Sequence, residues 1–363
     1  MKNLIISKSN IIFNKGIPMK ILGLLGLMLS LYTIPSFAGV NGPFTITCAT
    51  TCNASVDAAY QLMEDDLNSS LPNADASNYL IGMANASVLS MKASGSDYAN
   101  DIDLFVFKVS AGLGADIGDS SLSDFKGNTV RGVGISPSLM VGLNPGALFD
   151  LPEWEYFDMN KIKVFVNFFS LDIGALAGSE IDGKASNFGI HFRYKLIDPI
   201  AWAPGKLLHW TGVDIHTGFD YSSLTISTSQ TTTDSFTSGA ATANMSGTVK
   251  AGAEISTFTI PIEASTGIQL GYILSLYGGL GLDMSFGSAK SIATVDATFS
   301  TTGLASTADG DLDLGQEGKP TAVAPRMFFG TQFNISILKL GIQLDKSLSD
   351  AAYGVNFGLG VTW

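Results

Sequence analysis

The last thirteen residues of the chain, Ala351 to Trp363, alternate without a break between apolar and small or polar side chains. The apolar positions are Tyr353, Val355, Phe357, Leu359, Val361 and Trp363. Three of the five intervening positions are glycine, and the other two are Asn356 and Thr362. A period of two predicts an extended strand with one apolar face and one small, polar face. Because glycine suits a crowded lumen better than a face in solvent, the pattern favours the wall of a barrel.

The same alternation recurs along residues 101–363, which predicts an all-β, antiparallel, up-and-down transmembrane barrel of about ten strands, with eight to twelve possible. Only 14% of the residues are charged, and no apolar run of about 20 residues follows the N-terminal leader. High hydropathy without a helical span is expected of an alternating barrel. The expected strands are 102–116, 128–143, 161–175, 185–197, 209–227, 245–262, 267–287, 322–335, 337–347 and the last thirteen residues.

A closing strand that ends on an aromatic residue resembles the last strand of bacterial outer-membrane β-barrels. In that group the pattern is the insertion signal read by the barrel assembly machinery. The resemblance implies a Gram-negative outer membrane as the location, with membrane lipid and lipopolysaccharide as neighbours. It identifies no solute and no reaction.

Residues 1–38 have the features of a Sec signal peptide. Lys20 precedes an apolar stretch from Ile21 to Ile34, and small residues precede a cut at Gly39. Met19 is a possible alternative start. The leader holds four of the 20 basic residues and none of the 32 acidic ones, so the mature chain has a net charge of −16. Such a charge argues against nucleic acid as a partner, and it also leaves open a soluble, exported acidic protein.

Residues 39–100 are expected to form a helical periplasmic cap or a plug inside the lumen. Helical spacing appears at residues 56–67 and again at Leu80, Ala84, Val88 and Met91. Cys48 and Cys52, the only cysteines, are expected to form a disulfide in an exported chain. No metal site or cofactor is expected.

An even number of strands places both ends of the barrel in the periplasm, which assigns a side to each connection. The polar segments 228–244 and 288–321 are then expected as long outer loops. The second holds an acidic cluster suited to an extracellular ligand: Asp309, Asp311, Asp313 and Glu317. Segment 144–160 is expected as a short interfacial helix, unless the strand count is wrong there. A change of phase between Ile255 and Phe258 suggests a bulge.

The three histidines narrow the search for chemistry, because His191 and His216 lie on the predicted inward faces of neighbouring strands. One antiparallel register would set His191 opposite His216, Arg193 opposite Asp214, and Asn187 opposite Asp220. This register predicts a polar ladder inside the lumen. A structural role is expected for it, and a functional constriction or proton-active site is the alternative.

Asp214-Ile215-His216 resembles the Asp-x-His of omptin proteases, ten-stranded barrels that need a second acidic pair. Here Asp101-x-Asp103 or Asp311-x-Asp313 would have to supply it. The His-x-Ser pattern of barrel phospholipases is absent. The sequence therefore favours a non-enzymatic, narrow or plugged pore or a surface-exposed structural protein. A surface adhesin is the alternative, since loop length and polarity also fit an adhesin and the chain resembles spirochaete surface adhesins. An omptin-like protease is the third.

Overall fold

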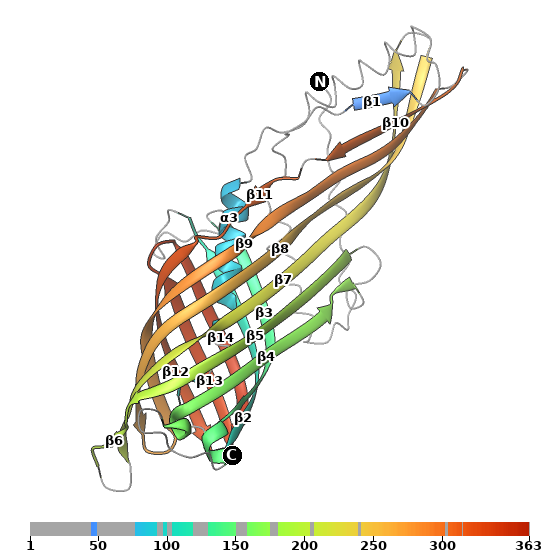
Figure 1. The fold of residues 1–363 in the computed structure, drawn as a ribbon. Coiled ribbons are helices and arrows are strands. Elements are labelled where there is room, and N and C mark those ends of the chain that lie inside the picture. The colour runs from blue at the N-terminus through green and yellow to red at the C-terminus, as the bar shows by residue number, and fades with distance from the viewer. Residues whose placement is uncertain are drawn as a thin grey trace, which may run out of the picture. The chain divides into compact units, whose positions relative to one another are not determined.

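Among the residues that the computed structural model describes, ten antiparallel strands form a closed ring (Figure 1). The ring closes because β14 pairs with β2 and β9 pairs with β12. Its strands are β2 (Phe105–Asp116), β3 (Gly132–Leu143), β4 (Ile162–Asp172), β5 (Ile181–Ile197), β7 (Leu208–Ser238), β8 (Ala241–Leu270), β9 (Leu274–Thr301), β12 (Val323–Ile335), β13 (Leu338–Ser347) and β14 (Ala352–Thr362). The all-β barrel of about ten strands predicted from the sequence is confirmed.

The structure describes residues 45–48, 77–92, 97–99, 104–118, 130–149, 158–174, 181–203, 207–238, 241–301, 304–313 and 315–362. The predicted signal peptide, the helical spacing at 56–67, Cys52 and Trp363 lie outside these residues. Cys48 ends the short strand β1 (Thr45–Cys48). The expected disulfide therefore stays a prediction.

The alternation of the sequence decides which side of the wall each residue faces. In β14, Phe357 and Leu359 are exposed on the outer face, whereas Asn356 and Gly354 are buried on the inner face. Large apolar side chains are exposed in the same way on β2, β9, β12 and β13. The barrel thus has an apolar outer face and a polar, buried inner face. No helix among the described residues is long and apolar enough to cross a membrane.

Three strands continue past the ring at one end. β7 pairs with β5 only as far as Thr228, and β9 pairs with β12 only as far as Met284. Beyond these points β7, β8 and β9 stay paired and are joined by β10 (Leu304–Asp313) and then β1. We call this extension the ribbon, the end that bears it the ribbon end, and the opposite end, where β2 begins and β14 ends, the base (Figure 1).

The ribbon corrects the prediction of two long outer loops. Most of 228–244 and of 288–321 is strand, and β7 and β8 meet in a hairpin at Ser238 and Ala241. Both segments are rich in threonine, which has a high β-propensity, so their polarity does not make them loops. Asp309, Asp311 and Asp313 lie on β10, and Glu317 lies on β11 (Glu317–Gly318), which pairs with β9.

Two of the four connections at the base are short turns. Residues 271–273 join β8 to β9, and Ser336, in the left-handed region with φ 58°, turns β12 into β13 as predicted. The connection from β3 to β4 holds α4 (Pro145–Phe149) and η3 (Met159–Lys161), so a short helix is present in 144–160. Between β5 and β7 lies β6 (Ile200–Ala201).

The predicted pairing of β5 with β7 and the predicted bulge between Ile255 and Phe258 in β8 are both wrong. Arg193 pairs with His216 and Lys195 with Asp214, so β7 is displaced by two residues from the predicted ladder. The irregularity of β7 lies between Trp210 and Val213, where Gly212 has φ +84°. In contrast, β8 pairs with β9 without a shift from Ala243 to Leu270.

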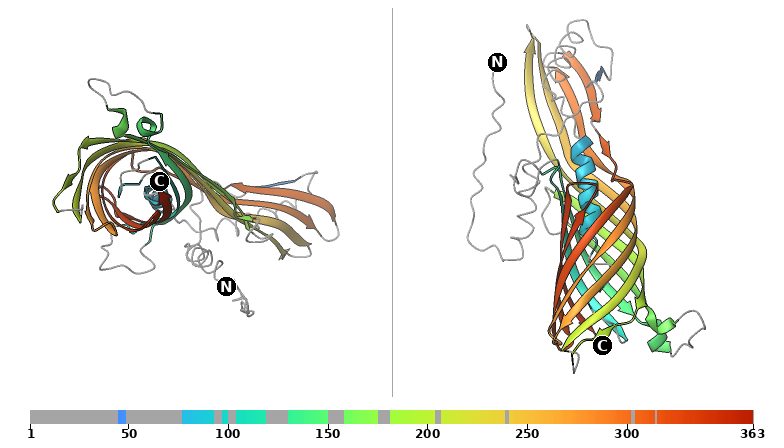
Figure 2. Two further views of the ribbon diagram at one scale, coloured as in Figure 1. Left: turned by 90° about the horizontal axis from the view of Figure 1, so that it is seen from below. Right: turned by 90° about the vertical axis from the view of Figure 1, so that its left-hand side faces the viewer.

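The phase change in β8 has a different cause, which is helix α3 (Ser77–Ser90). Ala253 and Ile255 point inward and pack against this helix, whereas Phe258 lies on the outer face. The helix, predicted from Leu80, Ala84, Val88 and Met91, lies inside the ring of strands (Figure 2). An apolar inward stretch therefore marks the helix contact and not a bulge.

Candidate functional site

Helix α3 lies directly on the barrel wall along a track of glycines. We call Gly112 and Gly114 of β2 and Gly132 and Gly134 of β3 the glycine track. A Cβ at Gly112 would overlap the backbone of Ser90, and one at Gly114 that of Ala86. A Cβ at Gly132 or Gly134 would likewise meet the helix backbone. Strand glycines often mark such a close approach of two backbones.

The first turns of α3 are held by apolar and polar contacts. Leu80, Met83 and Ala84 form one buried cluster with residues of β8 and β9. Asn85 Oδ1 accepts a hydrogen bond from the backbone N–H of Thr321 at 2.9 Å. The helix is therefore tied to the wall on more than one side.

The chain that follows α3 makes polar contacts with the wall. Lys92 Nζ lies 2.9 Å from Asp283 Oδ1, and both side chains are 1% exposed. The Tyr98 hydroxyl donates a 2.5 Å hydrogen bond to Glu263 Oε2, and the ring lies 4.9 Å from that of Phe328. Arg193 donates a hydrogen bond to the backbone carbonyl of Asp97. We call Lys92, Asp97 and Tyr98 the plug residues.

Arg326 is the centre of the charged network in the wall. Its guanidinium donates to Glu263, to Asp283 at 3.0 Å and to Asp345, and it is fully buried. Two of these carboxylates also contact plug residues, Glu263 through Tyr98 and Asp283 through Lys92. Wall and plug therefore share a single network of buried charges.

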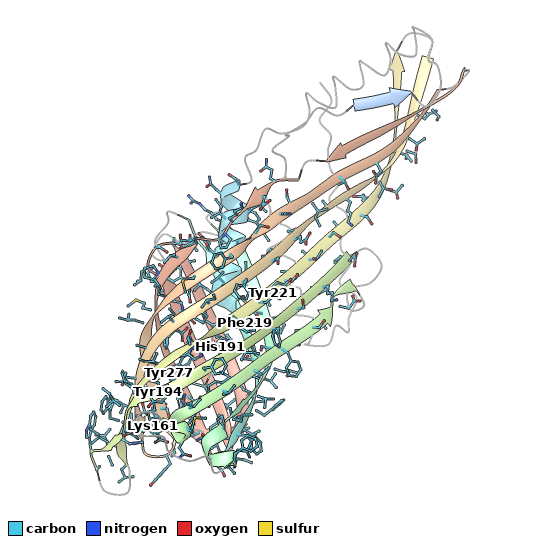
Figure 3. All side chains as sticks on the ribbon, viewed as in Figure 1. Lys161, His191, Tyr194, Phe219, Tyr221 and Tyr277 are labelled. Carbon is cyan, nitrogen blue, oxygen red and sulfur yellow. The ribbon has the colours of Figure 1, made fainter. Side chains whose placement is uncertain are left out.

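The five residues of the predicted polar ladder are all buried in the lumen. His191 Nε2 lies 2.8 Å from Asp220 Oδ1, and the rings of His191 and His216 stack with centroids 5.0 Å apart. Asp214 Oδ1 lies 3.8 Å from Arg193 Nε and 3.4 Å from Lys195 Nζ. The expected His–His and Arg–Asp contacts thus form across a different register, because long side chains reach diagonal neighbours. The five side chains come from β5 and β7. Figure 3 labels His191 on β5 and Tyr277 on β9.

The predicted protease pair is not brought together. Asp214 contacts Arg193 and Lys195, whereas His216 Nδ1 lies 2.8 Å from Glu263 Oε2. Asp311 and Asp313 lie on β10 in the ribbon, and Asp101 and Asp103 lie outside the described residues. His216 is also only 1% exposed. The Asp-x-His resemblance therefore reflects two inward positions of one strand.

Sequence reasoning did not identify Glu263, Asp283 and Arg326 as parts of this site. Each is a charged residue beside large apolar residues that face outward, as Asp283 is between Leu282 and Met284. The sequence feature that could have identified them is a single charged residue in an alternating apolar strand, since such a residue must face the lumen.

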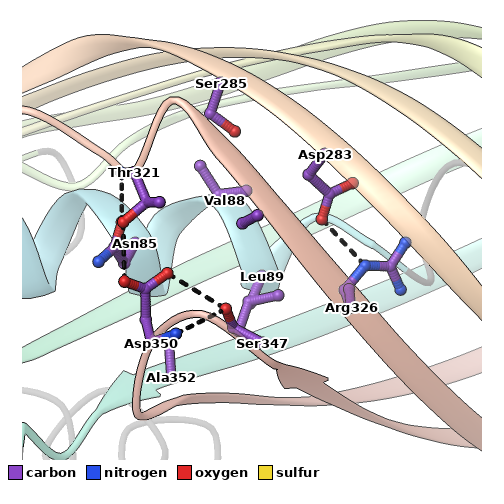
Figure 4. A pocket seen from close by; sticks show the side chains of 11 residues that line it. Asn85, Val88, Leu89, Asp283, Ser285, Thr321, Arg326, Ser347, Asp350 and Ala352 are labelled. Carbon is purple, nitrogen blue, oxygen red and sulfur yellow. Dashed lines mark hydrogen bonds and ion pairs between the residues drawn. The ribbon is translucent and has the colours of Figure 1, made fainter.

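A small cavity lies between helix α3 and the wall. The cavity of about 10 Å³, lined by residues of α3, β9, β12 and β13, has room for about one water molecule (Figure 4). Asn85, Asp283 and Arg326 are among its lining residues.

Outside the barrel wall, η3 at the base carries an exposed ion pair. Lys161 Nζ lies 2.8 Å from Asp198 Oδ2, and this hydrogen bond raises the pKa of Lys161. Because both side chains are open to solvent, the pair contributes little to stability.

A model of the Lsa36-like family matches residues 41–363. No curated protein matches the chain. Among solved structures, the translocator domain of the autotransporter NalP from Neisseria meningitidis is 10% identical, with 87% of this chain and 100% of that chain covered and a TM-score of 0.29.

Two further structures show the same level of similarity. The attachment invasion locus protein Ail of Yersinia pestis is 11% identical, with 72% of this chain and 98% of that chain covered and a TM-score of 0.25. The toluene transporter TodX of P. putida is 8% identical, with 77% and 93% covered and a TM-score of 0.25. The fold itself is established by the strand pairing.

Proposed function

The chain belongs to the Lsa36-like family, and we propose that it is an outer-membrane β-barrel closed by its own N-terminal segment, which acts as a surface-exposed structural and binding protein. The lumen is plugged in this proposal, so passage of solutes is not its main activity. Membrane lipid, lipopolysaccharide and the barrel assembly machinery are its proposed neighbours and partners.

The outer face of the barrel supports the membrane location. Leu280 is 63% exposed, and Phe329, Leu344 and Phe357 are exposed at neighbouring positions of the wall. A soluble monomer rarely exposes so large a continuous apolar surface. We therefore expect this face to contact the hydrocarbon of a membrane. The polar lumen is then expected to hold water or a plug.

The main support for a closed barrel is the buried network between the plug residues and the wall. Lys92 and Tyr98 are bound to Asp283 and Glu263, which are also bound to Arg326. Withdrawing the plug would leave these carboxylates without part of their compensation, which costs several kcal/mol for buried ion pairs. The closed state is therefore favoured.

The ribbon supports a role in binding. Exposed hydroxyl and carboxylate side chains lie opposite one another on three strands. Thr231, Thr248 and Asp296 form one row, and Thr233, Ser246 and Thr298 form the next. This polar face is suited to an extracellular ligand, which is the adhesin alternative. Acidic residues of β10, including Asp309 and Asp311, add negative charge to the ribbon.

Single-channel recording in planar bilayers tests the closure. We expect the full chain to show no stable open current, and the variant Lys92→Ala/Tyr98→Ala to show frequent openings. Ser138→Ala is the matched control, because this buried hydroxyl of β3 has no hydrogen-bond partner among the described residues. A steady open current from the unaltered protein would contradict the proposal.

The adhesin alternative is tested by adhesion of whole cells that express the protein to immobilised extracellular-matrix proteins. Thr231→Lys/Thr248→Lys should change adhesion if the exposed ribbon face binds the ligand. The control is Lys161→Met, a change of similar exposure at the base. Equal adhesion of all three strains would argue against the ribbon face as the binding surface.

A further inference from the structure

The contacts that the N-terminal segment makes along β9 show its path through the barrel. β9 runs from the base, at Leu274, to the ribbon, at Thr301. Leu80 lies in one apolar cluster with Ala289, Lys92 binds Asp283, and the ring of Tyr98 stacks on that of Tyr277. As the N-terminal chain advances, its contacts on β9 therefore move toward the base.

These contacts extend over a long stretch of β9, from the ribbon into the ring. Ala289 and Tyr277 are twelve positions apart, which is about 40 Å of extended strand. The glycine track gives the same direction, since Met83 lies beside Gly132 near the ribbon end of β3 and Ser90 lies beside Gly112, farther along the wall. After Tyr98 the chain reaches Phe105, which pairs with Leu143 at the base.

Strand β1, which precedes α3 in the chain, lies at the ribbon. β1 pairs with β10, with Thr45 opposite Asp311 and Ile46 opposite Gly310. β11, which follows β10, contacts the start of α3, because a Cβ at Gly318 would meet the backbone of Ile81. The order of contacts along the chain is thus ribbon, lumen and base.

We infer that the N-terminal segment crosses the outer membrane through the lumen of its own barrel, so that β1 is displayed on the cell surface as part of the ribbon. The inference rests on the proposed membrane location. The base is then periplasmic, because two of its four connections are short turns, at 271–273 and 336–337, whereas the ribbon extends the opposite end well past the ring, as long extracellular extensions do in outer-membrane barrels. β1 supplies the fifth strand of the surface-exposed sheet in this arrangement.

Three variants of the full chain carrying one peptide epitope test this topology. The epitope is placed after Val40, in the ribbon hairpin after Gly239, or in the base turn after Gly271. Antibody binding is measured on intact and on permeabilised cells, and heat-dependent gel mobility confirms that each barrel has folded. We expect the Val40 and Gly239 epitopes to be bound on intact cells and the Gly271 epitope only after permeabilisation.

Two results would overturn the inference in distinguishable ways. A Val40 epitope that needs permeabilisation, beside a Gly239 epitope that does not, would place the N-terminal segment in the periplasm and leave the proposed function intact. Equal behaviour of the Gly239 and Gly271 epitopes would reject the membrane-spanning barrel, and the inference with it.

A cysteine pair gives a second measurement that needs no insertion. Ile46→Cys/Gly310→Cys, in a chain with Cys48→Ser and Cys52→Ser, should cross-link on intact cells treated with an impermeant oxidant. Ile46→Cys/Gly271→Cys is the control and should not. A cross-link in the control alone would also overturn the inference.

Discussion

The charged side chains in the lumen form one network, so the removal of one partner leaves the others without charge compensation. Arg326 compensates Glu263, Asp283 and Asp345, all of them buried. Arg326→Met should lower the free energy of unfolding by about 3–5 kcal/mol, because it leaves buried carboxylates without a cation. Urea unfolding in detergent micelles measures this loss.

The exposed pair Lys161–Asp198 provides the matched control for Arg326. Lys161→Met removes a cation of the same chain but leaves both groups open to water, so the unfolding midpoint should hardly move. Equal losses from Arg326→Met and Lys161→Met would mean that water reaches the network in the lumen.

On the outer face, Leu280 is the most exposed leucine of the wall strands described. Leu280→Arg should cost about 2–4 kcal/mol in a lipid bilayer, as for a cation facing hydrocarbon at the midplane. Leu280→Met keeps an apolar side chain and should cost much less. Unfolding in lipid vesicles compares the two, and similar midpoints would mean that this face does not contact hydrocarbon.

Helix α3 depends on glycine at the positions where it meets the wall. Gly114→Ala should displace the helix, because its Cβ would overlap the carbonyl of Ala86. The expected loss is about 1–3 kcal/mol, as for overpacking. Gly341→Ala is the control, since the nearest atom lies 3.7 Å from its Cβ. Thermal unfolding of both variants tests this, and a larger effect at Gly341 would contradict the placement of α3.

The sequence could predict the elements better than their partners. Alternation revealed the wall strands and helical spacing revealed α3, because each pattern reports which side chains avoid water. Neither pattern could reveal that Ala253 and Ile255 face a helix inside the barrel. In the sequence, an apolar residue on the inward face looks like a break in the alternation. The register of β5 against β7 was also beyond reach, because a slip of two residues keeps every side chain on the same face and leaves a period-two pattern unchanged.

The ribbon and the shared charge network were not predictable for a related reason. Threonine-rich strands outside the barrel have the composition of polar loops, and only their pairing distinguishes them. Lys92 and Tyr98 lie near the end of a segment whose position in the lumen the sequence left open. Their partners Asp283 and Glu263 become neighbours only when the ring closes around the plug.

At the scale of the whole molecule, the closing strand should matter more for assembly than for stability. β14 completes the ring between β13 and β2, and its outward residues Phe357 and Leu359 are exposed. A chain that ends at Thr362 keeps all the described strand pairs of β14 and loses only Trp363, which we propose as part of an insertion signal. We expect its level in the outer membrane to fall severalfold, while the unfolding midpoint of protein refolded in detergent stays within experimental error of the full chain. Trp210→Phe, which alters another tryptophan of the wall, should change neither quantity. Normal outer-membrane levels of the shortened chain would show that the terminal aromatic is not read, whereas a lowered unfolding midpoint would show that it acts through the fold.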